Sequence, residues 1–325
     1  MALPFKLVYA EGYYLPLGDH VFPGAKYRLI HQRLLAQHIA EPADFLSAQP
    51  ASDDDVRLVH TDSYVDKLLT GTLSPLEERQ LEVPYSKQLV EAFWLSAGGS
   101  ILAAELALRD GVAINIGGGF HHAYPDHGEG FCMINDVAVA IRKLQSQGKI
   151  ARAMTVDCDV HHGNGTAAIF PPSSAARNAL PSSGSRPSVV ADPAGQSVFT
   201  ISLHQQNNYP AIKPPSAIDV NLPDGTEDST YLHWLDNALS SGLRQFTPDL
   251  ICYIAGADPY REDQLGGLAL TVEGLKQRDA LVFRVAKARG IPVMVTYAGG
   301  YARNVEDTVT IHCNTVVAAK EVFCA

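Results

Sequence analysis

The sequence predicts an α/β protein whose sheet is parallel and covered by helices on both faces. Three observations on its 325 residues support this prediction. Short apolar, β-branched runs alternate with longer segments of helical character. The apolar runs are almost continuous, which is typical of strands buried on both faces. Polar or glycine-rich clusters directly follow most of these runs, where open α/β sheets carry their binding sites.

Six runs have the length and composition of buried strands, bounded by turn residues. In chain order they are Lys6–Tyr9, Val112–Ile116, Ala153–Val156, Val198–Leu203, Leu250–Ala255 and Val293–Tyr297. Helical patterns lie between them and supply the crossovers that parallel strands require. These are Ala25–Gln37, Ser86–Leu108, Asn135–Gln147, Ser229–Phe246 and Thr271–Ala288.

Polar clusters follow five of these strands and would meet at one edge of the sheet. Because this site would draw on most of the chain, we expect one catalytic domain over residues 1–325. The clusters are Gly117–His122, Asp157–Asn164, Ser202–His204, Gly256–Asp258 and Gly299–Tyr301.

One segment interrupts the alternation. Residues 171–197 are rich in Pro, Ser, Ala and Gly and show no periodicity. The segment is longer than the roughly 12–15 residues beyond which unstructured loops become uncommon inside domains. We expect a flexible insertion that leaves the sheet at the face opposite the site. A deletion joining Phe170 to Val198 should therefore keep activity.

Bulk composition excludes several function classes. The net charge of −10 and the absence of a Lys/Arg-rich run argue against nucleic acid as a partner. The five cysteines form no CxxC pair, and most lie in or beside apolar runs, which indicates buried thiols in a reducing compartment. No segment looks long and apolar enough for a membrane span, and the N-terminus lacks a secretory pattern. We expect a cytoplasmic protein without a membrane partner.

A metal site is predicted after the third strand, in the stretch Asp157-Cys158-Asp159-Val160-His161-His162-Gly163-Asn164-Gly165. Asp159 and His161 are two positions apart, so in extended backbone both point to the same side. An oxygen and a nitrogen ligand converging in this way suit a catalytic zinc or iron ion. Asp258, held between an apolar strand and Pro259, is a candidate third ligand, although such an Asp alone is more often a helix cap.

Three further groups have the chemistry to serve such a metal. His121 and His122 follow a triple glycine, although adjacent histidines are in isolation more often surface residues. Asp157 and Asn164 could each accept a hydrogen bond from an imidazole and fix its tautomer. Tyr301, after two glycines, could donate to a developing oxyanion, although an ordinary turn tyrosine is the simpler interpretation of that residue alone.

Together these motifs resemble the histone deacetylase family of zinc-dependent amidohydrolases, from about His20 to about Thr315. The segments Gly117–His122, Asp263–Leu268 and Arg278–Phe283, with Asn164, look most like the class IV branch and its bacterial relatives. The resemblance implies an arginase/deacetylase-like three-layer fold with a mostly parallel, eight-stranded sheet. It also implies zinc, or iron(II) in the cell, on Asp159, His161 and Asp258, and a structural potassium ion. The implied potassium site consists of Asp157, Asp159, His161, Ser202 and Leu203, and the implied substrate channel of Gly130, Phe131, Tyr209 and Leu265.

The function implied is removal of an acyl group from an acylated lysine by metal-activated water. His122, kept neutral beside Asn164, would be the base; His121, paired with Asp157, would stay cationic; Tyr301 would stabilise the oxyanion. Two alternatives remain: deacetylation of an acetylpolyamine or another small amide, and non-catalytic binding of acyl-lysine. A binuclear manganese ureohydrolase is disfavoured because Gly163 stands where a further Asp ligand is expected. The acyl chain, the natural amine and the oligomeric state are left open.

Overall fold

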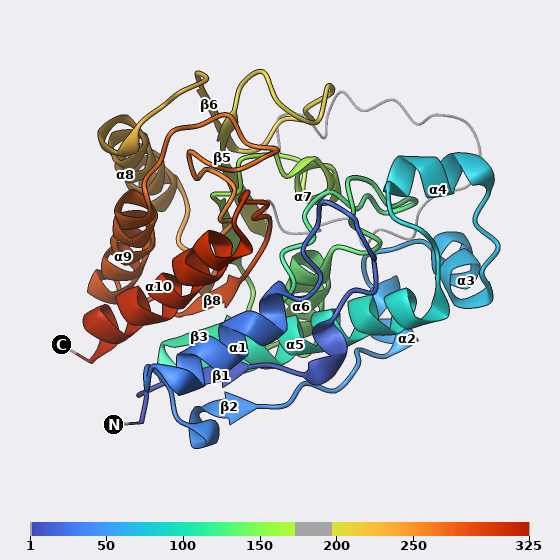
Figure 1. The fold of residues 1–325 in the computed structure, drawn as a ribbon, viewed down its shortest axis with the longest axis horizontal. Coiled ribbons are helices and arrows are strands. Elements are labelled where there is room, and N and C mark those ends of the chain that lie inside the picture. The colour runs from blue at the N-terminus through green and yellow to red at the C-terminus, as the bar shows by residue number, and fades with distance from the viewer. Residues whose placement is uncertain (1, 173–196, 325) are drawn as a thin grey trace.

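The computed structural model describes residues 2–172 and 197–324, and an eight-stranded sheet lies at its centre (Figure 1). The strands follow the spatial order β2-β1-β3-β8-β7-β4-β5-β6. Every neighbouring pair within the described residues is parallel. The strands are β1 (Lys6–Val8), β2 (Phe45–Leu46), β3 (Val112–Asn115), β4 (Ala153–Asp157), β5 (Val198–Gln205), β6 (Ile218–Leu222), β7 (Leu250–Ile254) and β8 (Val293–Thr296).

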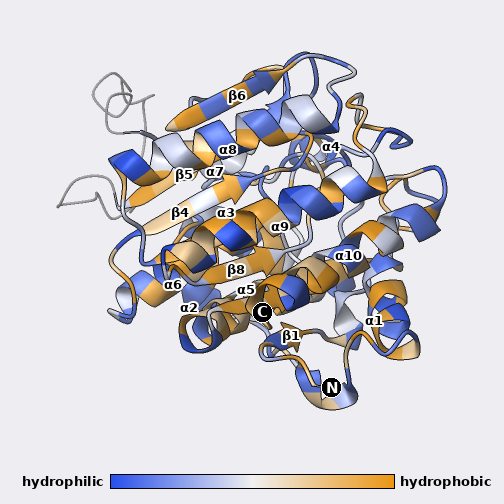
Figure 2. Ribbon diagram, turned by 90° about the vertical axis from the view of Figure 1, so that its left-hand side faces the viewer, coloured by the Kyte–Doolittle hydropathy of each residue, from blue (hydrophilic) through white to orange (hydrophobic). Residues whose placement is uncertain are grey.

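Helices form a layer on each face of this sheet. Helices α5 and α6 pack together on one face, and α5 contacts β1, β3, β7 and β8. Helices α1, α10, α9 and α8 follow one another across the other face, which Figure 2 shows from outside. The long helices are α1 (Lys26–Ala36), α5 (Lys87–Asp110), α6 (Asp136–Ser146), α8 (Asp228–Gln245), α9 (Val272–Ala288) and α10 (Val305–Phe323). The shorter ones are η1 (Glu11–Tyr13), η2 (Pro42–Asp44), α2 (Asp53–Arg57), α3 (Asp62–Thr70), α4 (Pro75–Leu81) and α7 (Asn164–Ile169).

Polar side chains set where the crossover helices begin. The Ser86 hydroxyl accepts a hydrogen bond from the Leu89 N–H at the start of α5, at 3.1 Å. The Asn135 side chain accepts from the Ala138 N–H at the start of α6, at 2.9 Å. Such caps satisfy backbone donors that have no partner inside the helix. These caps therefore fix the first residues of α5 and α6.

The centre of the sheet is its most apolar part. Every residue of β4 and β7 is buried, and β4 lies between β7 and β5. The edge strand β6 alternates between intermediate and exposed positions, and only its last residue, Leu222, is buried. The residues that follow β4 and β7 are therefore held by buried backbone on both sides, which gives the site rigid support.

The predicted elements are present with bounds that differ by at most two residues. Strands β2 and β6 and helix α10 were not predicted from the residues. The expectation that no segment could span a membrane was wrong by length and composition, because the 24-residue helix α5 passes that test. The apolar window of α5 is 72% buried inside the protein, so α5 is a core helix. The insertion predicted at 171–197 lies outside the described residues, apart from its first two residues and its last.

Candidate metal centre and catalytic site

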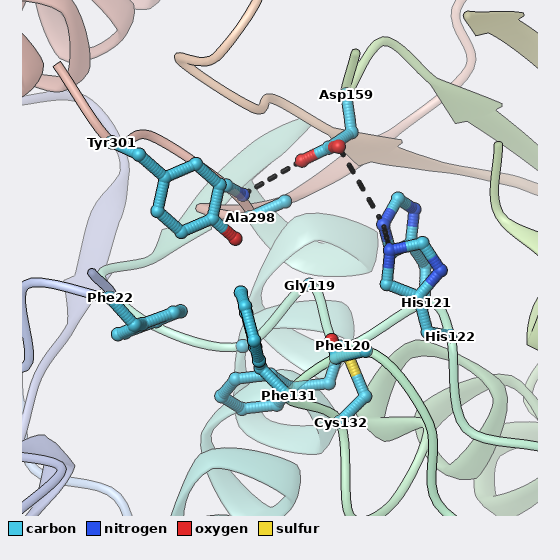
Figure 3. Close-up of a pocket in the computed structure, with 13 residues that line it drawn as sticks. Phe22, Gly119, Phe120, His121, His122, Phe131, Cys132, Asp159, Ala298 and Tyr301 are labelled. Atoms are coloured by element: carbon cyan, nitrogen blue, oxygen red, sulfur yellow. Dashed lines mark hydrogen bonds and ion pairs between the residues drawn. The ribbon is translucent and has the colours of Figure 1, made fainter. Parts of the chain in front are cut away.

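The predicted site residues come together at the carboxyl edge of the sheet. The loops after β3, β4, β7 and β8 carry them, and these four strands are neighbours in the order β3-β8-β7-β4. Figure 3 shows Tyr301 facing the imidazoles of His121 and His122, with Asp159 beside them. The parallel sheet therefore converts residues far apart in sequence into one cluster.

Asp159, His161 and Asp258 form a buried group that could hold a metal ion. One ligand atom from each lies within 4.8 Å of the others. His161 Nδ1 is 3.1 Å from Asp159 Oδ1 and 3.3 Å from Asp258 Oδ2. Burial, and then the charge of Asp159, raise the pKa of Asp258 to about 7. Two buried carboxylates this close call for a cation, and two carboxylates with one imidazole suit a zinc-type ion with an open position.

Gly299 lets the backbone approach these carboxylates. Its N–H donates a hydrogen bond to Asp159 Oδ2 at 2.8 Å. A Cβ atom at position 299 would collide with Asp258 Oδ2 and would lie 2.7 Å from Asp159 Oδ2. Glycine is thus required here by space, which gives a physical reason for the pair Gly299-Gly300 that precedes Tyr301.

The two adjacent histidines have different environments. The Nδ1 atom of His121 lies 2.7 Å from Asp157 Oδ2, and that of His122 lies 2.6 Å from Asn164 Oδ1. Their Nε2 atoms are 3.1 Å apart. Burial opposes the charging of His121, but Asp157 and Asp159 outweigh it and raise its pKa to about 9. Burial, and then the positive charges of His121 and His161, hold the pKa of His122 well below its usual range. One imidazole is therefore cationic and the other neutral near pH 7.

A glutamate that sequence reasoning missed, Glu129, fixes Asn164, the hydrogen-bond partner of His122. Asn164 Nδ2 donates to Glu129 Oε1 at 3.0 Å, and the Tyr209 hydroxyl donates to the same oxygen at 2.8 Å. Because the Asn164 amide is fixed at both ends, its oxygen must face His122 and its orientation is defined. The position of Glu129 next to Gly130-Phe131 was the only available signal.

Tyr301 is held by its own backbone. Its N–H donates to Asp263 Oδ2 at 2.6 Å, while Asp263 Oδ1 accepts from the N–H groups of Leu265 and Gly266 at 2.8 and 2.9 Å. Burial, and then the charges of Asp159 and Asp258, raise the pKa of the Tyr301 phenol well above its usual value. The hydroxyl therefore stays protonated as a donor. Asp263 had been singled out only as part of a motif, and this network supplies its role.

Arg278, the first residue of the segment Arg278–Phe283 named in the sequence analysis, joins the loops that carry the metal triad. Its Nη1 donates to the carbonyl of Cys158 at 3.1 Å and to that of Gly256 at 2.6 Å. Its charge is balanced by Asp279, which also accepts a hydrogen bond from Tyr253 at 2.5 Å. The ends of β4 and β7 are thus joined beneath the site by one fully buried side chain.

A buried lysine was also missed. Lys26 Nζ donates to the carbonyl of Ala298 at 2.6 Å and lies 4.5 Å from the centre of the Phe22 ring. Burial lowers its pKa to about 8, against the opposing charges of Asp258 and Asp159. A lysine in an ordinary helical pattern gives no sign of this position. It places a positive charge behind the carboxylates of the site.

A cavity of about 170 Å³ leads to the metal triad. His161, His122 and Tyr301 are part of its lining. The four predicted channel residues line it too, together with two that sequence reasoning missed; these are Gly130, Phe131, Tyr209 and Leu265, with Glu82 and Asn208. A second space of about 20 Å³ is lined by Tyr301, Asp159, His121 and His122. Its other lining residues include Phe22, Gly118, Gly119, Phe120, Cys132 and Ala298.

The predicted potassium site is structurally coherent. Asp157 and Ser202 are paired in register on β4 and β5, and Leu203 follows on β5. These three residues and the other two members of the predicted site, Asp159 and His161, are buried. Potassium itself stays a prediction.

His60 anchors the loop that carries Glu129 and Phe131. Its Nδ1–H donates to the carbonyl of Tyr124 at 2.9 Å, and its Nε2 accepts from the Asn135 N–H at 2.9 Å. Burial lowers the pKa of His60 to about 4, whereas an unfolded histidine has a pKa of about 6.5. As the pH falls, the unfolded chain therefore binds the proton before the folded chain does. The contribution of neutral His60 to the free energy of unfolding is complete above pH 6.5 and decreases as the pH drops towards 4.

We expect His60→Gln to weaken this pH dependence. Between pH 7.5 and 5.0 the variant should lose about 2 kcal/mol less unfolding free energy than the wild type, at ~1.4 kcal/mol per pH unit below 6.5. Urea unfolding at the two pH values measures the difference. The exposed His233→Gln is the control and should follow the wild type. Equal losses in all three proteins would contradict the account.

Comparison with known proteins gives one consistent result. The chain matches the histone deacetylase domain over residues 20–316. It is 39% identical to an uncharacterised protein of Picosynechococcus sp., over 98% of this chain and 99% of that protein. It is 31% identical to histone deacetylase 2 of Arabidopsis thaliana, over 88% of this chain and 70% of the relative. The solved structure of a histone deacetylase homologue complexed with SAHA, 23% identical, gives a TM-score of 0.76 over 98% of this chain and 84% of the other. These findings confirm the predicted fold class, whereas the class IV assignment stays a prediction.

Proposed function

Because this chain belongs to the histone deacetylase family and is thus a deacetylase, we propose that it is a metal-dependent lysine deacylase that prefers short acyl groups. The observation that carries the proposal is the arrangement of His121, His122 and Tyr301 around the Asp159–His161–Asp258 triad at the end of a channel. A protein that only bound acyl-lysine would not need this neutral base beside a cationic imidazole and a phenol donor.

In this proposal the triad holds zinc, or iron(II) in the cell. When bound, the ion would polarise the amide carbonyl and lower the pKa of a water. His122 gives its Nδ1–H to Asn164, so its Nε2, which lies 3.1 Å from His121 Nε2, carries the lone pair that would take a proton from water and pass it to the leaving amine. His121 stays charged beside Asp157 and stabilises the negative charge that develops. The Tyr301 hydroxyl donates to the carbonyl oxygen as it becomes an oxyanion.

The shape of the cavities supports a lysine stem with a short acyl group. Phe131 and Tyr209 provide apolar walls for a methylene chain, and the Glu82 carboxylate in the same lining suits an N–H group or a cation of the substrate. The space of about 20 Å³ beside Tyr301 has room for about one water-sized group. The methyl of an acetyl group is of this size, whereas a long fatty chain is far larger.

An acylated polyamine is the second candidate, and the carboxylates of Glu82 and Glu129 beside the channel favour it. Such a substrate carries further ammonium groups that acidic side chains would bind. The walls formed by Phe131 and Tyr209 suit the carbon chain of a lysine and that of a polyamine equally.

The test is hydrolysis by the zinc-loaded protein of one lysine peptide bearing acetyl, lactyl, octanoyl or myristoyl groups, with acetylputrescine alongside. We expect the acetyl peptide to have the highest kcat/KM and the myristoyl peptide the lowest. Faster turnover of the myristoyl peptide would contradict the short-acyl proposal. Turnover of acetylputrescine alone would favour the second candidate, and no turnover of any substrate would overturn the catalytic assignment.

A further inference from the structure

We propose a second metal site, separate from the catalytic triad and formed by His162, His204 and Asp219. One ligand atom from each of these side chains lies within 4.8 Å of the others. His162 follows β4, His204 lies on β5, and Asp219 lies on β6 at the edge of the sheet (Figure 2). The inference does not depend on the reaction that the chain catalyses.

The distances suit a small tetrahedral ion. His162 Nε2 lies 3.2 Å from Asp219 Oδ1. Two ligands bound at ~2.0–2.1 Å by a tetrahedral ion are about 3.3 Å apart. The rings of His162 and His204 are nearly perpendicular, at 88° with centroids 4.6 Å apart, so they approach the cluster from different directions. Asn221 Oδ1, which accepts a hydrogen bond from His204 Nε2–H at 2.9 Å, is a further oxygen beside the cluster.

Further hydrogen bonds orient the ligands from outside. Ser202 Oγ is 3.0 Å from His204 Nδ1, and His204 Nε2–H donates to Asn221 Oδ1 when no ion is bound. An ion at Nε2 would shift the proton to Nδ1, where the Ser202 hydroxyl can accept it. The Ser216 N–H donates to Asp219 Oδ2 at 2.9 Å, which leaves Oδ1 free. Such orientation of ligands is typical of metal sites.

Burial and access also fit a bound ion. His162 and His204 are fully buried, whereas the Asp219 side chain is 26% exposed, so an ion could enter from the side of β6. The other nitrogen of His162, Nδ1, is buried without a hydrogen-bond partner among the described residues.

The donor types select the class of cation. Two imidazoles, one carboxylate and one amide oxygen suit zinc or another late divalent transition metal. Calcium and magnesium take mainly oxygen ligands. His161 and His162 are neighbours whose side chains diverge, His161 towards Asp159 and Asp258 and His162 towards Asp219. An ion at the second site would therefore fix β4, β5 and β6 beside a ligand of the first.

The experiment counts metal in the full chain. The wild type, His162→Gln and Asp258→Asn are stripped, loaded with excess zinc, desalted and measured by mass spectrometry for zinc per chain. We expect about two equivalents in the wild type and about one in each variant. Zinc titration of Asp258→Asn should report the second site alone. Adding Asp219→Asn to this variant should weaken the affinity at least ~10-fold, because even partners of a metal ligand contribute 10–100-fold.

The outcomes separate the two sites. One equivalent in the wild type and in His162→Gln, with none in Asp258→Asn, would overturn the second site and leave the catalytic one. One equivalent in the wild type and in Asp258→Asn, with none in His162→Gln, would support the second site and count against the catalytic metal. The exposed His233→Gln controls for adventitious binding and should retain two equivalents. If His162→Gln does not fold, Asp219→Asn replaces it, since that side chain is partly exposed.

Discussion

Replacing His122 by asparagine is expected to lower kcat for acetyl-lysine hydrolysis by about 10²–10⁴-fold, the usual contribution of a general acid–base group. His122 is the neutral imidazole of the pair, since burial and two neighbouring cationic histidines hold its pKa well below the usual range. Its Nδ1 is fixed by Asn164 at 2.6 Å, so its Nε2 is positioned to accept the proton. Asparagine retains a polar group but has no basic nitrogen at pH 7.

Steady-state kinetics at saturating metal give kcat and KM for this variant. KM should change little, because the lost interaction belongs to the transition state. His233→Asn on α8 is the control, because this exposed histidine contacts Asn237 and lies outside the catalytic set. Metal content equal to that of the wild type would show that the triad is intact. A His122→Asn variant within a few-fold of wild-type kcat would remove His122 from the mechanism.

Replacing Tyr301 by phenylalanine is expected to cost about 10²–10³-fold in kcat, the typical effect of losing one oxyanion donor. The ring would keep its packing against Phe22 and Phe131, whose centroids lie 5.9 and 6.1 Å away. The Asp263 contact also persists, because it is made by the backbone N–H of residue 301. The fold and the metal triad should therefore be preserved, and only the hydroxyl is lost.

The measurement is kcat together with metal content and melting temperature. Tyr85→Phe is the control, because its hydroxyl donates to the carbonyl of Leu68, away from the catalytic residues. The control should retain wild-type kcat. Unchanged turnover in Tyr301→Phe would show that this phenol does not serve the oxyanion.

Local patterns predicted the centre of this protein well. Strands β3, β4, β7 and β8 are mostly apolar and buried throughout, so their positions and the loops after them could be located without a structure. The spacing of Asp159 and His161 alone indicated that they would share a side. Strand β6 was not predicted because its polar residues, Asp219 and Asn221, alternate with apolar ones at the sheet edge and interrupt the apolar run. Strand β2 has only two residues, too few for any pattern.

The missing site residues are those brought in by tertiary structure. Lys26 comes from α1, Glu82 from the residue after α4 and Glu129 from the loop after β3, each distant in sequence from the metal motif. None has a spacing that marks it, because its role depends on packing against another element. The same holds for His162, His204 and Asp219, which the pairing of β4, β5 and β6 brings together.

The central claim is that a metal ion held by Asp159, His161 and Asp258 is required for amide hydrolysis. The most direct measurement is turnover of an acetyl-lysine peptide by the wild type and Asp258→Asn, each stripped by a chelator and then titrated with zinc. We expect the stripped wild type to be inactive and to regain turnover as zinc is added, because the ion supplies the activated water. Asp258→Asn should stay inactive at the same zinc concentrations. Full turnover by the stripped wild type, or recovery in Asp258→Asn equal to that of the wild type, would contradict the account.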